Sequence, residues 1–257
     1  MFLKQFEITK DLPVADIVTK DYRTADIFRK HGISYCCAGK HPLQDACDMR
    51  GIDADEIKRE LEKMTRKVSI SPFIDFVDWD IGFLLDYILN VHHVYLDKAL
   101  PSLQILLRDF VQNHGKKHPY LEELERQFNL LVRSLRSSMA KEEGEIFPYI
   151  RQVLHAHKHK EPYAGLFIRT LRKPVEEALF KGHEITANLI LSIRQLTQTY
   201  TSPENVCLNH KVIIAKLKEL DNDLVQHIYL EESVLFPKVL QMEKELLDKH
   251  LTKTEIK

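Results

Sequence analysis

Glycine and proline are scarce in this sequence, with 8 glycines and 10 prolines among 257 residues. Because these residues mark turns and element ends, their scarcity predicts long, rarely interrupted elements. Long apolar runs are missing too, and no stretch approaches the ~20 apolar residues that a membrane span needs. The first residues also lack the apolar run of a secretion signal. We therefore expect a helix-rich cytoplasmic protein with no membrane partner.

A surplus of charge is also absent, because 37 basic residues face 38 acidic ones. This balance gives no attraction to nucleic acid, and we expect no such partner. The four cysteines are too few for a disulfide framework: Cys36, Cys37, Cys47 and Cys207. Adjacent Cys36 and Cys37 would lie ~3.8 Å apart at their Cα atoms, which is too close for a relaxed disulfide. These features favour a reducing compartment.

Three regions of the chain differ in character. Residues 1–66 predict a small helical domain, with one helix at 21–30 that ends before Gly32 and a second that begins at Asp53. A linker at 67–72 leads to residues 73–245, which carry long helical periodicities. Residues 246–257 are polar, and we expect this tail to fray.

Four long segments of the second region repeat apolar residues at three- and four-residue steps. They cover residues 79–113, 119–157, 165–200 and 204–245. The first should bend or break near Pro101, Pro174 lies near the start of the third, and Pro203 precedes the fourth. Amphipathic helices of this length and number predict an all-α fold, with a four-helix up-down bundle behind the small helical domain.

Each apolar stripe leads to a polar residue that should face the core. The stripes are Leu85 and Leu89 before His93; Leu121, Leu124, Phe128, Leu131 and Leu135 before Ser138 and Glu142; Leu179 and Phe180 before His183; and Ile213, Leu217, Leu220 and Leu224 before His227 and Glu231. A buried carboxylate is costly unless it is paired or bound to a metal.

The polar residues follow an internal duplication. Glu-Glu, three residues and Phe-Pro occur at 142–148 and again at 231–237. His93 lies 49 residues before Glu142, and His183 lies 48 residues before Glu231. One core histidine alone is usually structural, and His227 with Glu231 alone could form a hydrogen bond within one helix. The duplicated set on four facing stripes instead favours a metal site of imidazoles and carboxylates, which suit iron.

The repeated Glu-Glu…Phe-Pro preceded by histidine resembles a hemerythrin-like domain. Tyr-Cys-Cys-Ala-Gly-Lys at 35–40 resembles the Cys-Cys-Gly-Gly-Lys signature of the RIC family, "repair of iron centres". The resemblance covers residues 10–240. It implies two bridged irons held by four histidines and two glutamates. It also implies restoration of iron–sulfur clusters damaged by nitric oxide or oxidants, with damaged iron–sulfur proteins as partners and iron donation as one route.

Matching the family motif position by position implies five metal ligands: His93, Glu142, His183, His227 and Glu231. The sixth position, four residues before Glu142, is Ser138, so one iron should lack a protein nitrogen and hold water or a small ligand there. His92 is a weak substitute, since it points ~100° away from His93 on a regular helix.

The same resemblance implies a catalytic role for Cys36 and Cys37 in redox or cluster handling, against the alternative of two small buried residues. Cys207 is interpreted as a passive residue at a helix start, and the histidines at 155, 157 and 159 as a solvated helix end.

A second reading stays open: a hemerythrin-like module that binds or senses the diatomic ligands O2 and NO without repair. A ferritin-like oxidase is discounted because the sequence has no Glu-x-x-His. Monomer and homodimer are both compatible with the sequence.

Overall fold

The computed structural model describes residues 7–36, 39–65 and 75–254, apart from the side chains of 171–182 and 249–254. Within these ranges the chain forms helices and no strand. It divides into two compact units. The small unit contains Met1–Phe73 together with Tyr200–Lys218, and the bundle unit contains Ile74–Thr199 together with Glu219–Lys257. The all-α prediction is confirmed, whereas residues 200–218 group with the small unit rather than with the bundle.

The small unit is built from short helices. They are α1 (Val14–Lys20), a 3-10 turn (Tyr22–Thr24), α2 (Ala25–Lys30), α3 (Leu43–Asp48) and α4 (Ala54–Thr65). The two predicted helices are present. Asp21 accepts a hydrogen bond from the Arg23 N–H, Gly32 follows α2 at a φ of 66°, and Asp53 accepts one from the Asp55 N–H. Both α1 and α3 follow a proline, a start signal that sequence reading missed.

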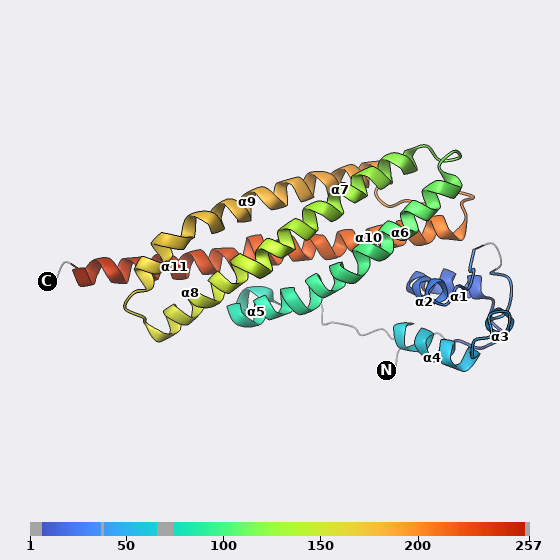
Figure 1. Ribbon diagram of the computed structural model, residues 1–257, viewed down its shortest axis with the longest axis horizontal. Coiled ribbons are helices and arrows are strands. Elements are labelled where there is room, and N and C mark those ends of the chain that lie inside the picture. Colours follow the sequence, from blue (N-terminus) through green and yellow to red (C-terminus); the bar gives the residue numbers. More distant parts are fainter. Residues whose placement is uncertain (1–6, 37–38, 66–74, 255–257) are drawn as a thin grey trace. The chain divides into compact units, whose positions relative to one another are not determined.

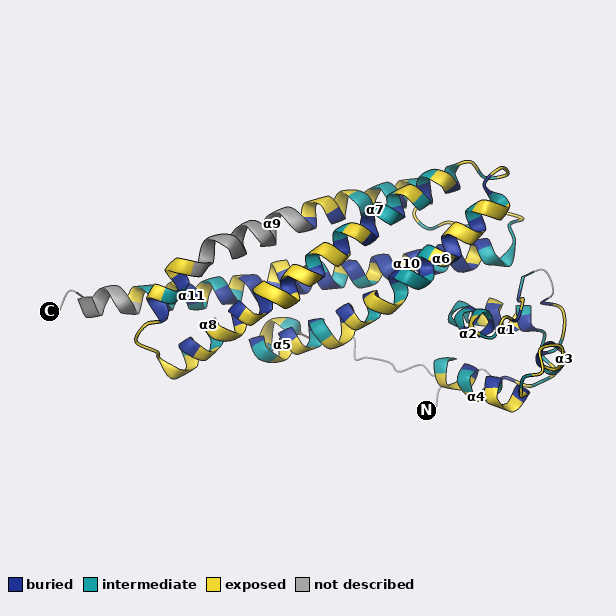
Figure 2. Ribbon diagram, in the orientation of Figure 1, coloured by how far each residue is buried: buried dark blue, intermediate teal, exposed yellow. Residues whose placement is uncertain are grey.

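The bundle consists of four long helical rods that alternate in direction (Figure 1). They are α5 (Ile81–Tyr87) with α6 (Val94–His114), α7 (Tyr120–Lys141) with α8 (Phe147–His159), α9 (Ala164–Leu196), and α10 (Leu208–Tyr229) with α11 (Phe236–Thr254). The predicted stripe from Leu121 to Leu135 is buried along α7 (Figure 2). The side chains of Leu179, Phe180 and Pro174 lie outside the described residues. So does the predicted linker at 67–72.

Three of the four rods contain a π-helical segment, in which the hydrogen bonds skip one extra residue. These segments are Ile88–His93, Glu142–Ile146 and Leu230–Leu235. The expected break near Pro101 is wrong, because α6 continues through Pro101. Buried Leu100 and Leu103 on either side of it pack into the bundle. The first rod departs from α-helical geometry about two turns before Pro101, in the segment Ile88–His93 that contains the candidate ligand His93.

The tail was also predicted wrongly, because α11 continues to Thr254 instead of ending at residue 245. Leu246 is 6% exposed and belongs to the core cluster that Leu85, Ile150 and Leu235 share. Burial of this apolar side chain stabilises the helix past residue 245, although the sequence there is mostly polar. None of the helices in the described ranges is long and apolar enough to span a bilayer.

Candidate metal centre

Four buried ligand groups from three rods meet in the middle of the bundle. One ligand atom from each of His93, Glu142, His227 and Glu231 lies within 4.8 Å of the others. His93 Nε2 is 3.3 Å from His227 Nε2 and 3.3 Å from Glu142 Oε2. His227 Nε2 is 3.2 Å from Glu231 Oε1. Two imidazole nitrogens and two carboxylate oxygens therefore converge on one point, as a metal site requires.

His183, from the fourth rod, approaches the same two carboxylates from their other side. Its Nε2 is 3.1 Å from Glu231 Oε2 and 3.8 Å from Glu142 Oε1. Each glutamate thus turns one oxygen to the pair His93 and His227 and its second oxygen to His183. Two carboxylates placed in this way would be able to hold two neighbouring metal ions. The structure brings together all five residues that the sequence predicted as ligands.

The polar atoms of this cluster fit a bound cation. In the described part of the chain, the buried Nδ1 of His227 has no hydrogen-bond partner, and the buried Oε2 atoms of Glu142 and Glu231 contact only His93 at 3.3 Å and His183 at 3.1 Å. Burial raises the pKa of Glu142, but hydrogen bonds from His183, His93 and Ser138 outweigh it and hold the pKa below its usual range. The pKa of Glu231 is likewise lowered, against its burial, by the charge on His227. Both carboxylates are therefore ionised and ready to bind a metal.

The second glutamate of each Glu-Glu pair orients a histidine. Glu143 Oε1 lies 2.6 Å from Nδ1 of His93, and Glu232 Oε1 lies 2.9 Å from Nδ1 of His183. A carboxylate on Nδ1 fixes the ring and leaves Nε2 free to bind a metal. The duplication therefore serves two functions. The first glutamate of each pair lies in the cluster. The second glutamate contacts the histidine of the preceding rod; its side chain is 47% exposed for Glu143 and 44% exposed for Glu232.

Ser138 and His92 complete the surroundings. Ser138 donates a hydrogen bond of 2.5 Å from its Oγ to Glu142 Oε1, so the serine faces the centre as the repeat predicted. His92 is buried rather than turned outward, because it lies in the π-helical segment and not on a regular helix. Its ring stacks on His227, and its Nδ1 is 2.9 Å from Asp223 Oδ1. The only sequence signal for a buried His92 is that it stands next to His93. Helical periodicity alone placed the His92 side chain in the wrong direction.

Of the two predicted catalytic cysteines, the described one, Cys36, is not part of the His/Glu cluster. Cys36 follows α2 in the small unit and is half-buried, whereas Cys37 lies outside the described residues. The histidines at 155 and 157 form ion pairs with Glu161 and Glu245 at 2.9 Å and 2.8 Å. This agrees with a solvated helix end.

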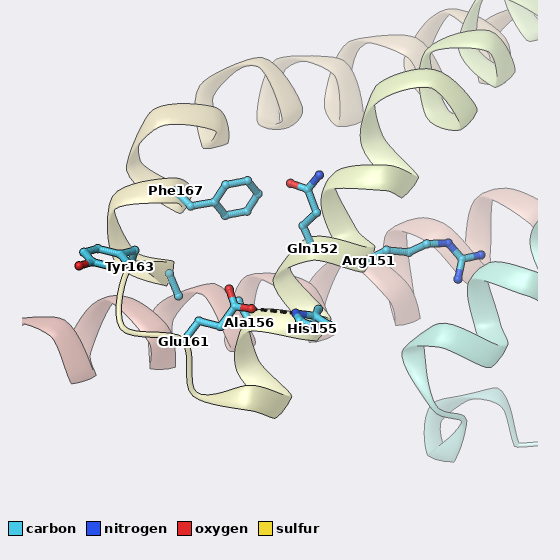
Figure 3. Close-up of a pocket in the computed structure, with 8 residues that line it drawn as sticks. Arg151, Gln152, His155, Ala156, Glu161, Tyr163 and Phe167 are labelled. Carbon is cyan, nitrogen blue, oxygen red and sulfur yellow. Dashed lines mark ion pairs between the residues drawn. The ribbon is translucent and has the colours of Figure 1, made fainter.

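A pocket of about 450 Å³ lies where α8 turns into α9 (Figure 3). Figure 3 shows Phe167 and Tyr163 on the α9 side and Gln152 and Arg151 on α8. Its remaining lining residues are His155, Ala156, Glu161 and Ala164. None of the residues that line it belongs to the His/Glu cluster, so it is separate from the candidate metal centre.

Comparison with known proteins decides the family. A hemerythrin HHE cation-binding domain matches residues 84–239, and a domain of unknown function named ScdA_N matches residues 10–65. The iron–sulfur cluster repair protein ScdA of Staphylococcus epidermidis is 30% identical over 233 residues, which are 90% of this chain and 99% of that protein. This chain belongs to the RIC family. YtfE of Escherichia coli is 27% identical over 231 residues, 90% of this chain and 97% of YtfE.

The two matched regions contain the candidate ligands and the predicted catalytic cysteines. The cation-binding match includes the five candidate ligands, and the ScdA_N match includes Cys36 and Cys37. Within this RIC chain the departure is local: a serine at 138, whose hydroxyl contacts Glu142, beside the second buried carboxylate of Glu231.

Proposed function

We propose that this protein is a cytoplasmic di-iron protein that restores iron–sulfur clusters damaged by nitrosative or oxidative stress, with iron donation as its route. The observation that carries the di-iron assignment is the position of the two buried carboxylates, each of which turns one oxygen to His183 and the other to the pair His93 and His227. The repair assignment is supported by relatives that are named iron–sulfur cluster repair proteins.

The chain's own residues suggest how the site would work. Bound iron would supply the metal ion and the electrons that a damaged cluster lacks. Glu142 and Glu231 would hold both metal positions in a region that water does not reach, because they are 3% and 0% exposed. The His183 side offers one histidine nitrogen against two on the other side. We therefore assign the more weakly held, donatable ion to the His183 side.

We assign Cys36 and Cys37 to the handling of the client cluster, with damaged iron–sulfur proteins as the clients. Thiolates are good ligands for iron in clusters. Cys36 is half-buried, so it is within reach of solvent and of a docked partner. In this scheme the bundle stores iron and the small unit meets the client.

A repair assay tests the proposal. A purified enzyme with a [4Fe–4S] cluster is inactivated with nitric oxide, and its activity is followed after addition of iron-loaded protein and a thiol reductant. We expect recovery with wild type, little recovery with Glu231→Ala, and loss of recovery with full iron retention in a Cys36→Ser/Cys37→Ser double variant. Equal recovery from free ferrous iron at the same concentration would contradict the proposal.

Ser138 favours a second candidate, in which the protein binds or senses O2 or NO without repair. Its small side chain stands where the second half of the repeat has His227, one turn from a bridging glutamate. A diatomic ligand fits such a position better than it fits a site with six protein ligands. Tight, reversible NO binding by a protein that restores no cluster would favour this candidate over repair.

A further inference from the structure

The ring of His227 is held differently from the rings of the other two cluster histidines. Nδ1 of His93 contacts the Glu143 carboxylate at 2.6 Å. Nδ1 of His183 contacts the Glu232 carboxylate at 2.9 Å. Nδ1 of His227 is buried and, within the described ranges, has no hydrogen-bond partner. Histidines that bind metals usually have such an outer partner, which fixes the direction of the ring. The His227 ring therefore needs another support.

The ring of His92 lies parallel to the ring of His227. Their centroids are 5.5 Å apart, and their planes differ by 6°. The ring of His93 meets the same ring edge-on, with centroids 5.0 Å apart and planes at 69°. All three rings are buried. Because buried side chains are closely packed, a ring between two such neighbours has little freedom to turn.

Asp223 and Tyr87 hold His92 in turn. Asp223 Oδ1 is 2.9 Å from Nδ1 of His92, and because a carboxylate accepts, Nδ1 carries the proton and donates it. The Tyr87 ring meets the His92 ring at 72°, with centroids 5.5 Å apart. Asp223 stands four residues before His227 on α10, so both side chains leave the same face of that helix. His92 thus spans one turn of α10, from an acid to a candidate ligand.

The internal repeat links these residues as a set. It relates the first rod to the third and the fourth rod to the second. The counterparts are Gly182 for His92, Ser134 for Asp223 and Ser138 for His227. Where the ligand histidine is replaced, the sequence also lacks the ring that would pack on it and the acid that would hold that ring. This joint replacement indicates that the ring and the acid serve the ligand.

His92 acts on the cluster through His227 and not through a carboxylate of the centre. Each of the three cluster histidines comes within 3.3 Å of Glu142 or Glu231, whereas the carboxylate that His92 contacts is Asp223. The Nε2 of His92 is buried and lacks a hydrogen-bond partner in the part of the chain that the structure describes. A direct role as a ligand is therefore the alternative that an experiment has to separate.

We propose that His92 is a positioning residue: held by Asp223, its ring fixes the orientation of the His227 ring and so directs His227 Nε2 to the metal. The π-helical segment Ile88–His93 makes this possible, because it turns two successive histidines into the bundle. The inference rests on the proposed di-iron centre, since it takes His227 as a ligand.

The metal affinity of the full chain tests this role. Metal-free protein is titrated with zinc, a redox-inert probe, in competition with a chromophoric chelator. His92→Ala should weaken zinc binding on the His93 side about tenfold, as the loss of an outer partner does. It should also change the visible bands of the cobalt(II)-loaded protein, which report the geometry of the ligands. Val91→Ala, an exposed neighbour on the same segment, is the matched control and should bind zinc as wild type does.

His92→Phe separates positioning from direct binding. Its ring can pack on His227 but offers no nitrogen, so its zinc affinity should stay within about threefold of wild type. A loss as large as that of His92→Ala, in a variant that folds by circular dichroism, would overturn the proposal, because the nitrogen of His92 would then be the group that matters.

A double-mutant cycle tests the path from Asp223 and does not depend on the phenylalanine variant. Asp223→Ala should weaken zinc binding about threefold, and it should add nothing to His92→Ala, because Asp223 acts through His92. Asp97→Ala removes an exposed acid of α6 and controls for charge. Additive losses would contradict the path.

The zinc titration also separates the two proposals. Equal zinc affinity in wild type and His92→Ala would overturn this inference alone. A wild-type protein that takes up no metal would overturn it together with the di-iron centre.

Discussion

Ser138 Oγ and Glu142 Oε1 are 2.5 Å apart, one helical turn from each other on the second rod. The matching pair in the fourth rod is His227 and Glu231, whose Nε2 and Oε1 are 3.2 Å apart. The two halves of the repeat thus present the same geometry with different chemistry. The serine hydroxyl donates a hydrogen bond to the Glu142 carboxylate, whereas an imidazole offers a nitrogen to a metal.

Ser138→His is expected to complete the weaker side of the centre. The new imidazole would lie one turn before Glu142, as His227 does before Glu231, and should raise metal affinity on the His183 side by about tenfold, or ~1.4 kcal/mol. It should also slow azide or nitric oxide binding, because it takes the position that an external ligand would use. Ligand titration with iron content measured in parallel checks this. Unchanged iron retention together with unchanged ligand binding would show that position 138 does not reach a metal.

Glu231→Ala should cost far more metal than Ser138→Ala. Glu231 is 0% exposed and turns an oxygen to each side of the centre, so its loss removes a donor from both metal positions. Ser138→Ala removes only a hydrogen bond to Glu142. Elemental analysis of both variants after identical iron loading makes the comparison, with circular dichroism as the control for folding. Equal iron loss in the two variants would contradict the bridging role of Glu231.

Glu143→Gln should weaken metal binding without removing a ligand. The glutamine cannot offer the charged acceptor that Glu143 places 2.6 Å from Nδ1 of His93. Losing such an outer partner typically costs 10–100-fold in affinity, and because Glu143 is half exposed we expect about tenfold. Glu145→Gln is the matched control, an exposed acid on the same π-helical segment. Competition with a chromophoric chelator gives both affinities. If Glu145→Gln lowered the metal affinity as much as Glu143→Gln does, the loss would be due to the change in net charge and not to the contact with His93.

Metal binding should strengthen as the pH rises. Burial lowers the pKa of His183, but hydrogen bonds with Glu142 and Glu231 outweigh it and raise the pKa to about 10. The metal-free histidine therefore holds a proton below pH 10, and a metal must displace it because the ligand is neutral imidazole. Zinc, as a redox-inert probe, should release this proton when calorimetry is run in buffers of different ionisation enthalpy. His183→Ala should release fewer protons; an equal number would place the proton on another group.

The residues that come together in the His/Glu cluster could be predicted from the sequence, but the local backbone around them could not. The periodic stripes placed His93 and Glu142 on core faces because a helix with 3.6 residues per turn aligns them with buried leucines. The same periodicity predicted that His92 points ~100° away from His93. The structure buries both adjacent histidines because a π-helical segment changes the angle between successive side chains. The spacing of apolar residues in the sequence does not reveal the extra residue that a π-helical turn contains.

Contacts between distant segments were also beyond the sequence. Nothing local to Cys207 or Lys216 indicates that the start of α10 packs with the small unit, because such a contact depends on how the chain returns. The roles of Glu143 and Glu232 were missed for a related reason. The repeated Glu-Glu marked both residues, but only the folded helices show that each second glutamate reaches a histidine on the preceding rod.

The metal count of the purified protein tests the central claim most directly. The full chain is loaded with ferrous iron without oxygen, freed of excess metal, and analysed for iron, manganese and zinc before and after exposure to air, with the visible spectrum recorded. The two bridging carboxylates predict two irons per chain and the absorption bands of an oxo-bridged iron pair. They also predict that Glu231→Ala loses both. One tightly held zinc per chain, with no uptake of iron, would contradict the di-iron centre.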